Sequence, residues 1–62
     1  MKRVDLERHL RKHHCRFHRE GGDHTVFENA QNQRRTSIPR HREIPKYTVR
    51  AICRQLDIPE PN

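Results

Sequence analysis

The apolar positions of this chain follow helical spacing at both ends and alternate like strands in between. Residues 3–14 contain Leu6 and Leu10, four residues apart, with charged side chains at most other positions and no glycine or proline. This spacing is typical of a helix whose apolar side chains share one face. A second helix is predicted after Pro45, where the apolar residues recur at i, i+3, i+4 and i+7: Val49, Ile52, Cys53 and Leu56.

The ends of the second helix are marked by residues with known positional preferences. Thr48 is the predicted N-cap, because its hydroxyl can accept a hydrogen bond from a backbone N–H of the first turn. The helix is expected to end near Asp57, because Pro59 and Pro61 cannot continue it.

Two strands joined by a tight turn are predicted after the first helix. In the first strand two sets of residues alternate, Cys15, Phe17 and Arg19 with Arg16, His18 and Glu20. Residues 21–23, Gly-Gly-Asp, then turn the chain, and residues 24–29 form the second strand.

A third strand is predicted after a polar loop at residues 29–33. It runs from Arg34 to about Arg40, with Thr36 and Ile38 on one face. Pro39 has no N–H for a strand ladder, which favours an edge strand or a strand end there. A charged connector follows: Arg40, His41, Arg42 and Glu43.

The order of these elements defines the fold class. Helix, three antiparallel strands and helix indicate an α+β protein, α-β-β-β-α, with both helices on one face of a three-stranded antiparallel sheet. If Thr25 and Phe27 point at the helices, then His24, Val26 and Glu28 point to the other face. Residues 1–62 are expected to form a single domain.

Composition limits what so small a domain can hold. Of the 62 residues, 29% are hydrophobic, so the core is expected to be thin. Domains below about 70 residues usually draw part of their stability from a staple or a partner. We therefore expect no deep substrate pocket and no cofactor, and we expect a protein partner to supply additional stability.

The charge balance points to polyanions as partners. Fourteen Lys and Arg against eight Asp and Glu give a net charge of +6 and a pI near 10.4. Eleven of the fourteen are arginines, whose planar guanidinium suits phosphate contacts and stacking on bases. A basic surface that is simply solvated is the alternative interpretation.

The cysteines and the chain start indicate a cytoplasmic protein. Cys15 and Cys53 are the only cysteines, and we expect both thiols to be reduced and buried. The first residues are charged rather than apolar, and no apolar run approaches the length of a membrane span, so neither a signal peptide nor a membrane anchor is expected.

One histidine stands out because of the residues before it. Gly21 and Gly22 are the only glycines of the chain, and His24 follows them with one residue between. Paired glycines mark a tight strand reversal or a close approach of backbone to a ligand. His24 is therefore a candidate for proton transfer, and both glycines are expected to form the turn that supports it.

A metal site is the competing interpretation of the histidines. His9 and His13 lie four residues apart, and three further potential ligands follow: His14, Cys15 and His18. No Cys-x2-Cys pair exists, and a structural zinc site needs a second ligand pair at compatible spacing. We expect no metal, and we interpret these histidines as a solvated or partner-facing surface.

Several stretches carry a resemblance to a known family: residues 1–3, 6–10, 19–24, 38–44 and 48–52. The most specific are the Gly-x-His element that ends at His24 and the Pro-Arg-His element that ends at His41. In these stretches the chain resembles the HicA family of small bacterial toxins, the messenger-RNA interferases of type II toxin–antitoxin pairs. Two positions depart from it, because Tyr47 and Asp57 stand where glycine is common.

The resemblance implies a fold like that of double-stranded RNA-binding domains, an endoribonuclease activity on mRNA, and neutralisation by a HicB-type antitoxin. It also implies that His24 is the catalytic residue, acting as general base or as the acid that protonates the leaving oxygen. The expected products carry a cyclic phosphate and a 5′-hydroxyl, because RNA supplies its own nucleophile in the 2′-hydroxyl. A non-catalytic RNA-binding module is the alternative, and a zinc-stapled nucleic-acid-binding domain is a third.

The candidates for RNA binding are mostly arginines near the turn, on the third strand and at the start of the last helix. The backbone N–H groups at the start of that helix also suit a phosphate. We expect these residues to act as a patch rather than singly: Arg19, Arg34, Arg35, Arg40, His41, Arg42, Lys46 and Arg50.

Overall fold

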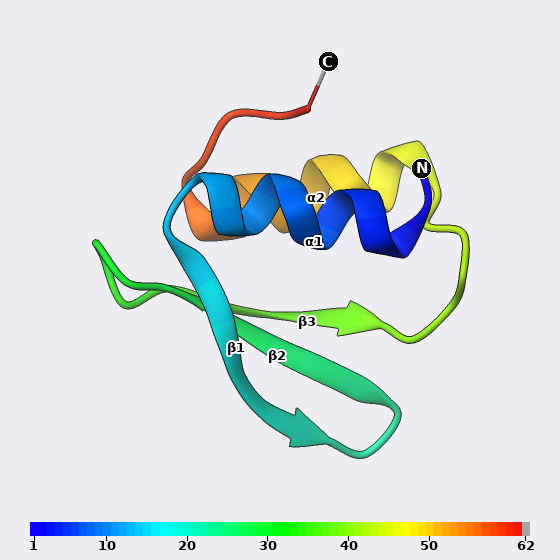
Figure 1. Cartoon of the computed structure of the whole chain (residues 1–62), viewed down its shortest axis with the longest axis horizontal. Coiled ribbons are helices and arrows are strands. Elements are labelled where there is room, and N and C mark those ends of the chain that lie inside the picture. Colours follow the sequence, from blue (N-terminus) through cyan, green and yellow to red (C-terminus); the bar gives the residue numbers. More distant parts are fainter. Residues whose placement is uncertain (62) are drawn as a thin grey trace.

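A computed structural model describes residues 1–61, and the last residue of the expected domain lies outside the described range. The elements follow the predicted order: α1 (Arg3–Lys12), β1 (Cys15–Gly21), β2 (His24–Asn29), β3 (Arg35–Pro39) and α2 (Lys46–Leu56). Both helices cover one face of a three-stranded antiparallel sheet (Figure 1), which confirms the predicted fold class. No helix of the described residues is long and apolar enough to cross a membrane.

The sheet has the strand order β1-β2-β3, with β2 in the centre. Pro39 is the last residue of the edge strand β3, as its missing N–H predicts. The start of the chain lies beside the connector before α2, because Ile44 N–H donates to the carbonyl of Met1 at 2.7 Å. This pairing ties the N-terminal end of α1 to the connector.

The core lies between the sheet and the helices. It contains ten buried residues: Leu6, Leu10, Cys15, Phe27, Ile38, Ile44, Val49, Ile52, Cys53 and Leu56. Both thiols are free and buried, and burial raises the pKa of each, that of Cys53 to about 11. The predicted core positions of both helices are thereby confirmed.

A β-bulge corrects the predicted alternation of β1. Phe17 pairs with Phe27, but the next pair is Arg19 with Val26, so His18 is an extra residue in the strand. The expected alternation put Arg19 on the same face as Phe17 and was wrong. Because the two pairs are one step apart on β2, Arg19 and Phe17 point to opposite faces.

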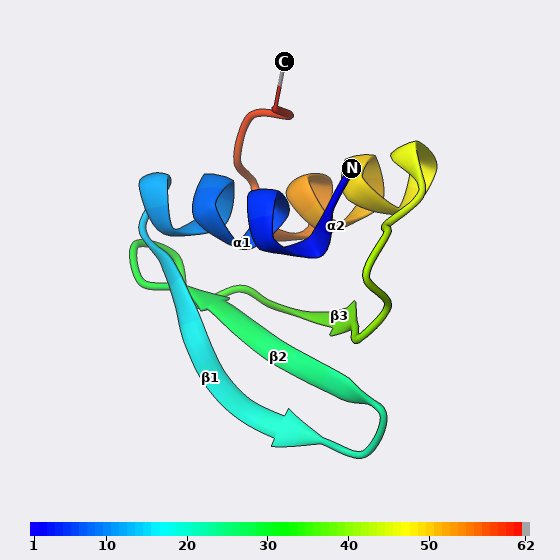
Figure 2. The same ribbon diagram turned by 45° about the vertical axis from the view of Figure 1, so that its right-hand side comes forward.

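We call the face of the sheet that no helix covers the open face. Figure 2 shows both helices on the far side of the sheet from it. Cross-strand partners share a face, so the strand pairing defines its members. They are Arg16, Arg19, Gly21, His24, Val26, Glu28, Arg35, Ser37 and Pro39.

Both helices begin or end differently from the sequence prediction. The first helix ends at Lys12 because His14 takes a left-handed conformation with φ 69°, which directs the chain into β1. Thr48 is not the N-cap of α2. The helix already begins at Lys46, the N-cap position is Pro45, and Thr48 N–H donates to the Pro45 carbonyl at 3.0 Å.

The end of α2 is closed at Asp57, close to where the prolines predicted it. Asp57 adopts a left-handed conformation, with φ 59° and ψ 49°, and Ile58 N–H donates back to the Cys53 carbonyl at 3.0 Å. This is the Schellman arrangement, in which glycine is the preferred residue at the left-handed position. The Asn29 side chain adds a hydrogen bond of 2.9 Å to the last helical carbonyl, that of Leu56.

Replacing Asp57 should therefore change stability in opposite directions for two small residues. Asp57→Gly should raise the free energy of unfolding by about 0.5–1 kcal/mol, because glycine reaches positive φ without a Cβ clash. Asp57→Ala should lower it, because alanine keeps the Cβ and tolerates the left-handed region less well than aspartate does. Urea denaturation followed by circular dichroism measures both; equal shifts for the two variants would contradict this account.

Candidate active site

His24 is the first residue of β2 and pairs with Gly21 on one side and Pro39 on the other. It belongs to the open face and its side chain is exposed. The predicted orientation of this histidine is confirmed, because Thr25 pairs with the core residue Ile38 on the opposite face. An imidazole at this place is accessible to a large substrate.

Arg19 lies on the neighbouring strand β1, on the same face as His24. The bulge turns Arg19 onto the open face, and its guanidinium lies over Gly21, the direct cross-strand partner of His24. A Cβ built on Gly21 would come within 3.2 Å of Arg19 Nη1 and 3.7 Å of Val26 Cγ2. The open face therefore places a cation over the residue paired with His24, a position that regular strand alternation would not give to Arg19.

The two glycines have different roles. Gly22 has a φ of 57° and opens the tight turn, whereas Gly21 is the last residue of β1 and does not need positive φ. The expectation that both glycines form the turn is correct for Gly22 alone. Gly21 instead leaves the space in which the Arg19 guanidinium lies.

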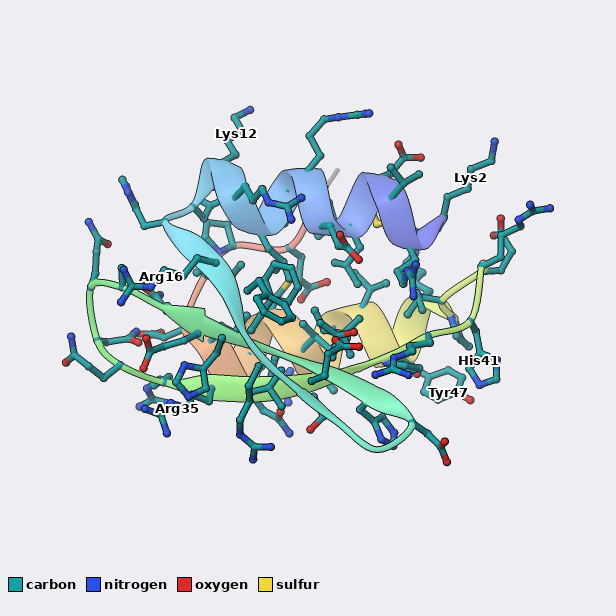
Figure 3. All side chains as sticks on the ribbon, turned by 60° about the horizontal axis from the view of Figure 1, so that its bottom comes forward. Lys2, Lys12, Arg16, Arg35, His41 and Tyr47 are labelled. Carbon is teal, nitrogen blue, oxygen red and sulfur yellow. The ribbon has the colours of Figure 1, made fainter. Side chains whose placement is uncertain are left out.

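Further cations gather at the same end of the molecule, on the other side of the sheet. An open groove of about 610 Å³ is lined by Lys2, Arg3, Val4, Glu7, Arg40 and Arg42. Arg40 pairs there with Glu20, whose other carboxylate oxygen accepts a hydrogen bond of 2.9 Å from Thr25. Figure 3 shows His41 and Tyr47 at this end together with Lys2.

The remaining RNA-binding candidates lie away from His24. Arg35 starts β3 and pairs with Glu28, at the end of the sheet opposite the tight turn, and Arg34 precedes it. Arg50 lies on α2, where its Nε is 3.4 Å from Glu60. Lys46 begins α2 and lines a separate small hollow with Met1, Val49, Glu60 and Pro61. The predicted patch is thus split between two ends and both sides of the sheet.

Sequence reasoning missed three cations. Arg16 lies on the open face. Strand alternation could have identified it, because Arg16 precedes the bulge and regular alternation still holds at its position. Lys2 and Arg3 reach the groove only because Lys2 forms an isolated bridge with Glu43, and Arg3 N–H donates to the Arg42 carbonyl at 2.8 Å. No local pattern signals that long-range pairing.

The histidines of the competing metal interpretation do not converge. Among residues 1–61 no group of three or more His, Cys, Asp or Glu side chains is placed to hold a metal ion. The rings of His9 and His13 lie 4.6 Å apart, and His9 Nε2 lies 2.7 Å from the Pro59 carbonyl oxygen. The pKa of His13 is lowered by desolvation and by the neighbouring His9, while Cys15 is buried in the core.

Fold and site together define a small basic α-β-β-β-α protein with an exposed histidine and an arginine on the same uncovered face of the sheet. The family model described as the HicA toxin of bacterial toxin–antitoxin matches residues 4–58. The chain therefore belongs to the HicA toxin family, as the resemblance predicted. No curated protein and no solved structure matches it at a significant level.

The different roles of the glycines can be tested by alanine substitution. Gly22→Ala should lower the free energy of unfolding by about 1 kcal/mol, because alanine is strained at positive φ. Gly21→Ala should change it by less than about 0.5 kcal/mol, because only the flexible end of Arg19 has to move. Chemical denaturation measures both values, and a larger loss for Gly21→Ala would contradict the assignment.

Proposed function

We propose that this protein is an endoribonuclease, an mRNA interferase that acts as the toxin of a type II toxin–antitoxin pair in the cytoplasm. The observation that carries the proposal is the exposed His24 on the open face, with the Arg19 guanidinium over its cross-strand partner Gly21. Membership of the HicA toxin family supports it.

The chemistry needs few protein groups because RNA brings its own nucleophile. The 2′-oxygen attacks the adjacent phosphorus, the bond from phosphorus to the 5′-oxygen breaks, and a 2′,3′-cyclic phosphate and a 5′-hydroxyl remain. One proton leaves the 2′-hydroxyl and one reaches the 5′-oxygen. Histidine exchanges protons readily near neutral pH, so His24 can serve as the base or as the acid.

Arg19 would stabilise the charge that develops on the phosphorane. A guanidinium offers several N–H donors in a planar fork that fits phosphate oxygens. In this protein its guanidinium lies over Gly21, the strand partner of His24, so it is near enough to reach a phosphate bound at His24. We assign the proton transfer to His24 and the charge stabilisation to Arg19.

A HicB-type antitoxin is the proposed protein partner. It would inhibit the enzyme by covering His24, which the fold leaves exposed. The interface would also stabilise the toxin, because binding to the native state alone adds to the free energy of unfolding.

A non-catalytic RNA-binding module remains the second candidate. The basic groove favours it, because Lys2, Arg3, Arg40 and Arg42 lie on the helix side of the sheet, where His24 does not reach. Such a groove could hold a phosphate backbone without cutting it.

Replacing the histidine separates the two candidates. In excess chelator, the wild type should cleave a long single-stranded RNA, and His24→Ala should be at least about 100-fold slower, because it lacks the proton-transferring group. His13→Ala is the matched control, since this histidine follows the last residue of α1 and belongs to neither the candidate active site nor the RNA-binding candidates, and should retain activity. Denaturing gels measure the rate.

Each alternative has its own outcome in that assay. RNA binding without cleavage by the wild type would support the non-catalytic module. Loss of the circular dichroism signal on addition of chelator would instead support a zinc-stapled domain.

The groove makes a separate prediction about affinity. Arg40→Ala combined with Arg42→Ala should weaken RNA binding and reduce the slope of log K against log salt by about 0.7 for each phosphate that the protein no longer neutralises. Arg8→Ala combined with Arg54→Ala removes the same charge from exposed helix positions and should leave the slope nearly unchanged. Fluorescence anisotropy at several salt concentrations measures it. Equal slopes for both pairs would exclude the groove as a phosphate site.

A further inference from the structure

The open face carries a second group of cations at the end opposite His24. Glu28 Oε1 lies 3.3 Å from Arg16 Nη2, and Glu28 Oε2 lies 3.0 Å from Arg35 Nε. These three residues come from three neighbouring strands and are direct cross-strand partners. We call Arg16, Glu28 and Arg35 the arginine clamp. Figure 3 shows Arg16 and Arg35 on the same side, away from His41 and Tyr47.

The clamp has a buried carboxylate and two exposed guanidiniums. The Glu28 side chain is only 8% exposed, whereas those of Arg16 and Arg35 are 69% and 55% exposed. Hydrogen bonds from Arg35 and then Arg16 lower the pKa of Glu28, so the carboxylate stays charged at neutral pH. Each guanidinium uses one nitrogen on Glu28, which leaves further N–H donors of its fork for a ligand.

A continuous surface connects the clamp to the candidate active site. His24 and Glu28 are four residues apart on β2, or about 13 Å along a strand. Arg19, Val26 and Ser37 lie between them, and the bulged His18 is near enough to Glu28 to contribute to its lowered pKa. Among the paired strand positions of the open face, Glu28 is the only acidic residue.

This arrangement fits a polyanion that carries one line of regularly spaced charges. Arg19 lies over Gly21 at the His24 end, and Arg16 and Arg35 mark the other end of a track that follows the central strand. A single-stranded RNA presents one such line of phosphates, and guanidiniums hold phosphates with charge-assisted hydrogen bonds. A duplex would present two strands on a wider surface and would match only one of them to this track.

We propose that single-stranded RNA lies along the open face, with the scissile phosphate at His24 and a phosphate a few nucleotides away bound by Arg16 and Arg35. This substrate track rests on the proposed nuclease function, and it adds a binding subsite remote from the reacting atoms. The subsite holds the RNA in register at His24. It therefore affects the KM for RNA more than the kcat of the bound complex.

The experiment measures binding in the absence of cleavage. In a His24→Ala background, Arg16→Gln combined with Arg35→Gln should weaken the binding of a fluorescent single-stranded RNA pool roughly tenfold and lower the salt slope by about 0.7 for each phosphate left without a cation. Glutamine can still donate a hydrogen bond to Glu28. The matched control is Arg8→Gln combined with Arg54→Gln, which removes the same charge from helix positions away from the open face.

Thermal unfolding of each variant shows whether the fold is retained. If the double variant does not fold, the triple variant with Glu28→Gln removes the buried carboxylate that has lost its partners, with Arg8→Gln as the control of equal net charge. Either comparison decides the proposal. Affinity and salt slope equal to those of the control would overturn the track, and so would equal losses on single-stranded and double-stranded RNA.

Cleavage assays with His24 intact keep the two proposals apart. The clamp variant should have a raised KM and a nearly unchanged kcat on single-stranded RNA. If the wild type binds RNA through the clamp but does not cleave it, the nuclease function fails and the track stands. If the clamp variant cleaves with the KM and kcat of the wild type, the nuclease function stands and the track fails.

Discussion

The rest of the structure depends on the fact that this chain has apolar residues for only one packed layer. Ten buried residues fill the space between the sheet and the helices, and Val26 is the single buried apolar residue of the open face. The other face of the sheet is left to polar side chains because nothing remains to cover it. A small core thus determines that the candidate active site lies on an open surface rather than in a pocket.

Much of this fold could be predicted because burial on one side imposes clear periods on the sequence. The spacing of Leu6 and Leu10, and that of Val49 and Leu56, follows directly from helices with one buried face. The position of His24 on the uncovered face was equally accessible, because strand alternation fixes it once Phe27 is placed in the core. Periodic signals of this kind need no knowledge of distant contacts.

The features that the sequence did not reveal are those that break a period or join distant segments. The bulge at His18 moves Arg19 to the face of His24, and no local pattern distinguishes it from regular alternation. The contact between Met1 and Ile44 likewise brings the start of the chain to the groove. The prediction of Thr48 as the N-cap was wrong because α2 begins two residues earlier, at Lys46. No local sequence signal distinguishes a threonine in the first turn of a helix from one that precedes the helix.

The bulge also has a consequence for how the length of this region can vary. His18 is the residue that the ladder leaves without a partner, while Phe17 and Arg19 keep consecutive partners on β2. A chain with one residue fewer at this point could form an unbroken ladder and still place its arginine opposite Val26. A deletion at this site is therefore compatible with an arginine that stays on the face of His24. The length of β1 can therefore change at His18 without moving Arg19 from its position opposite Val26.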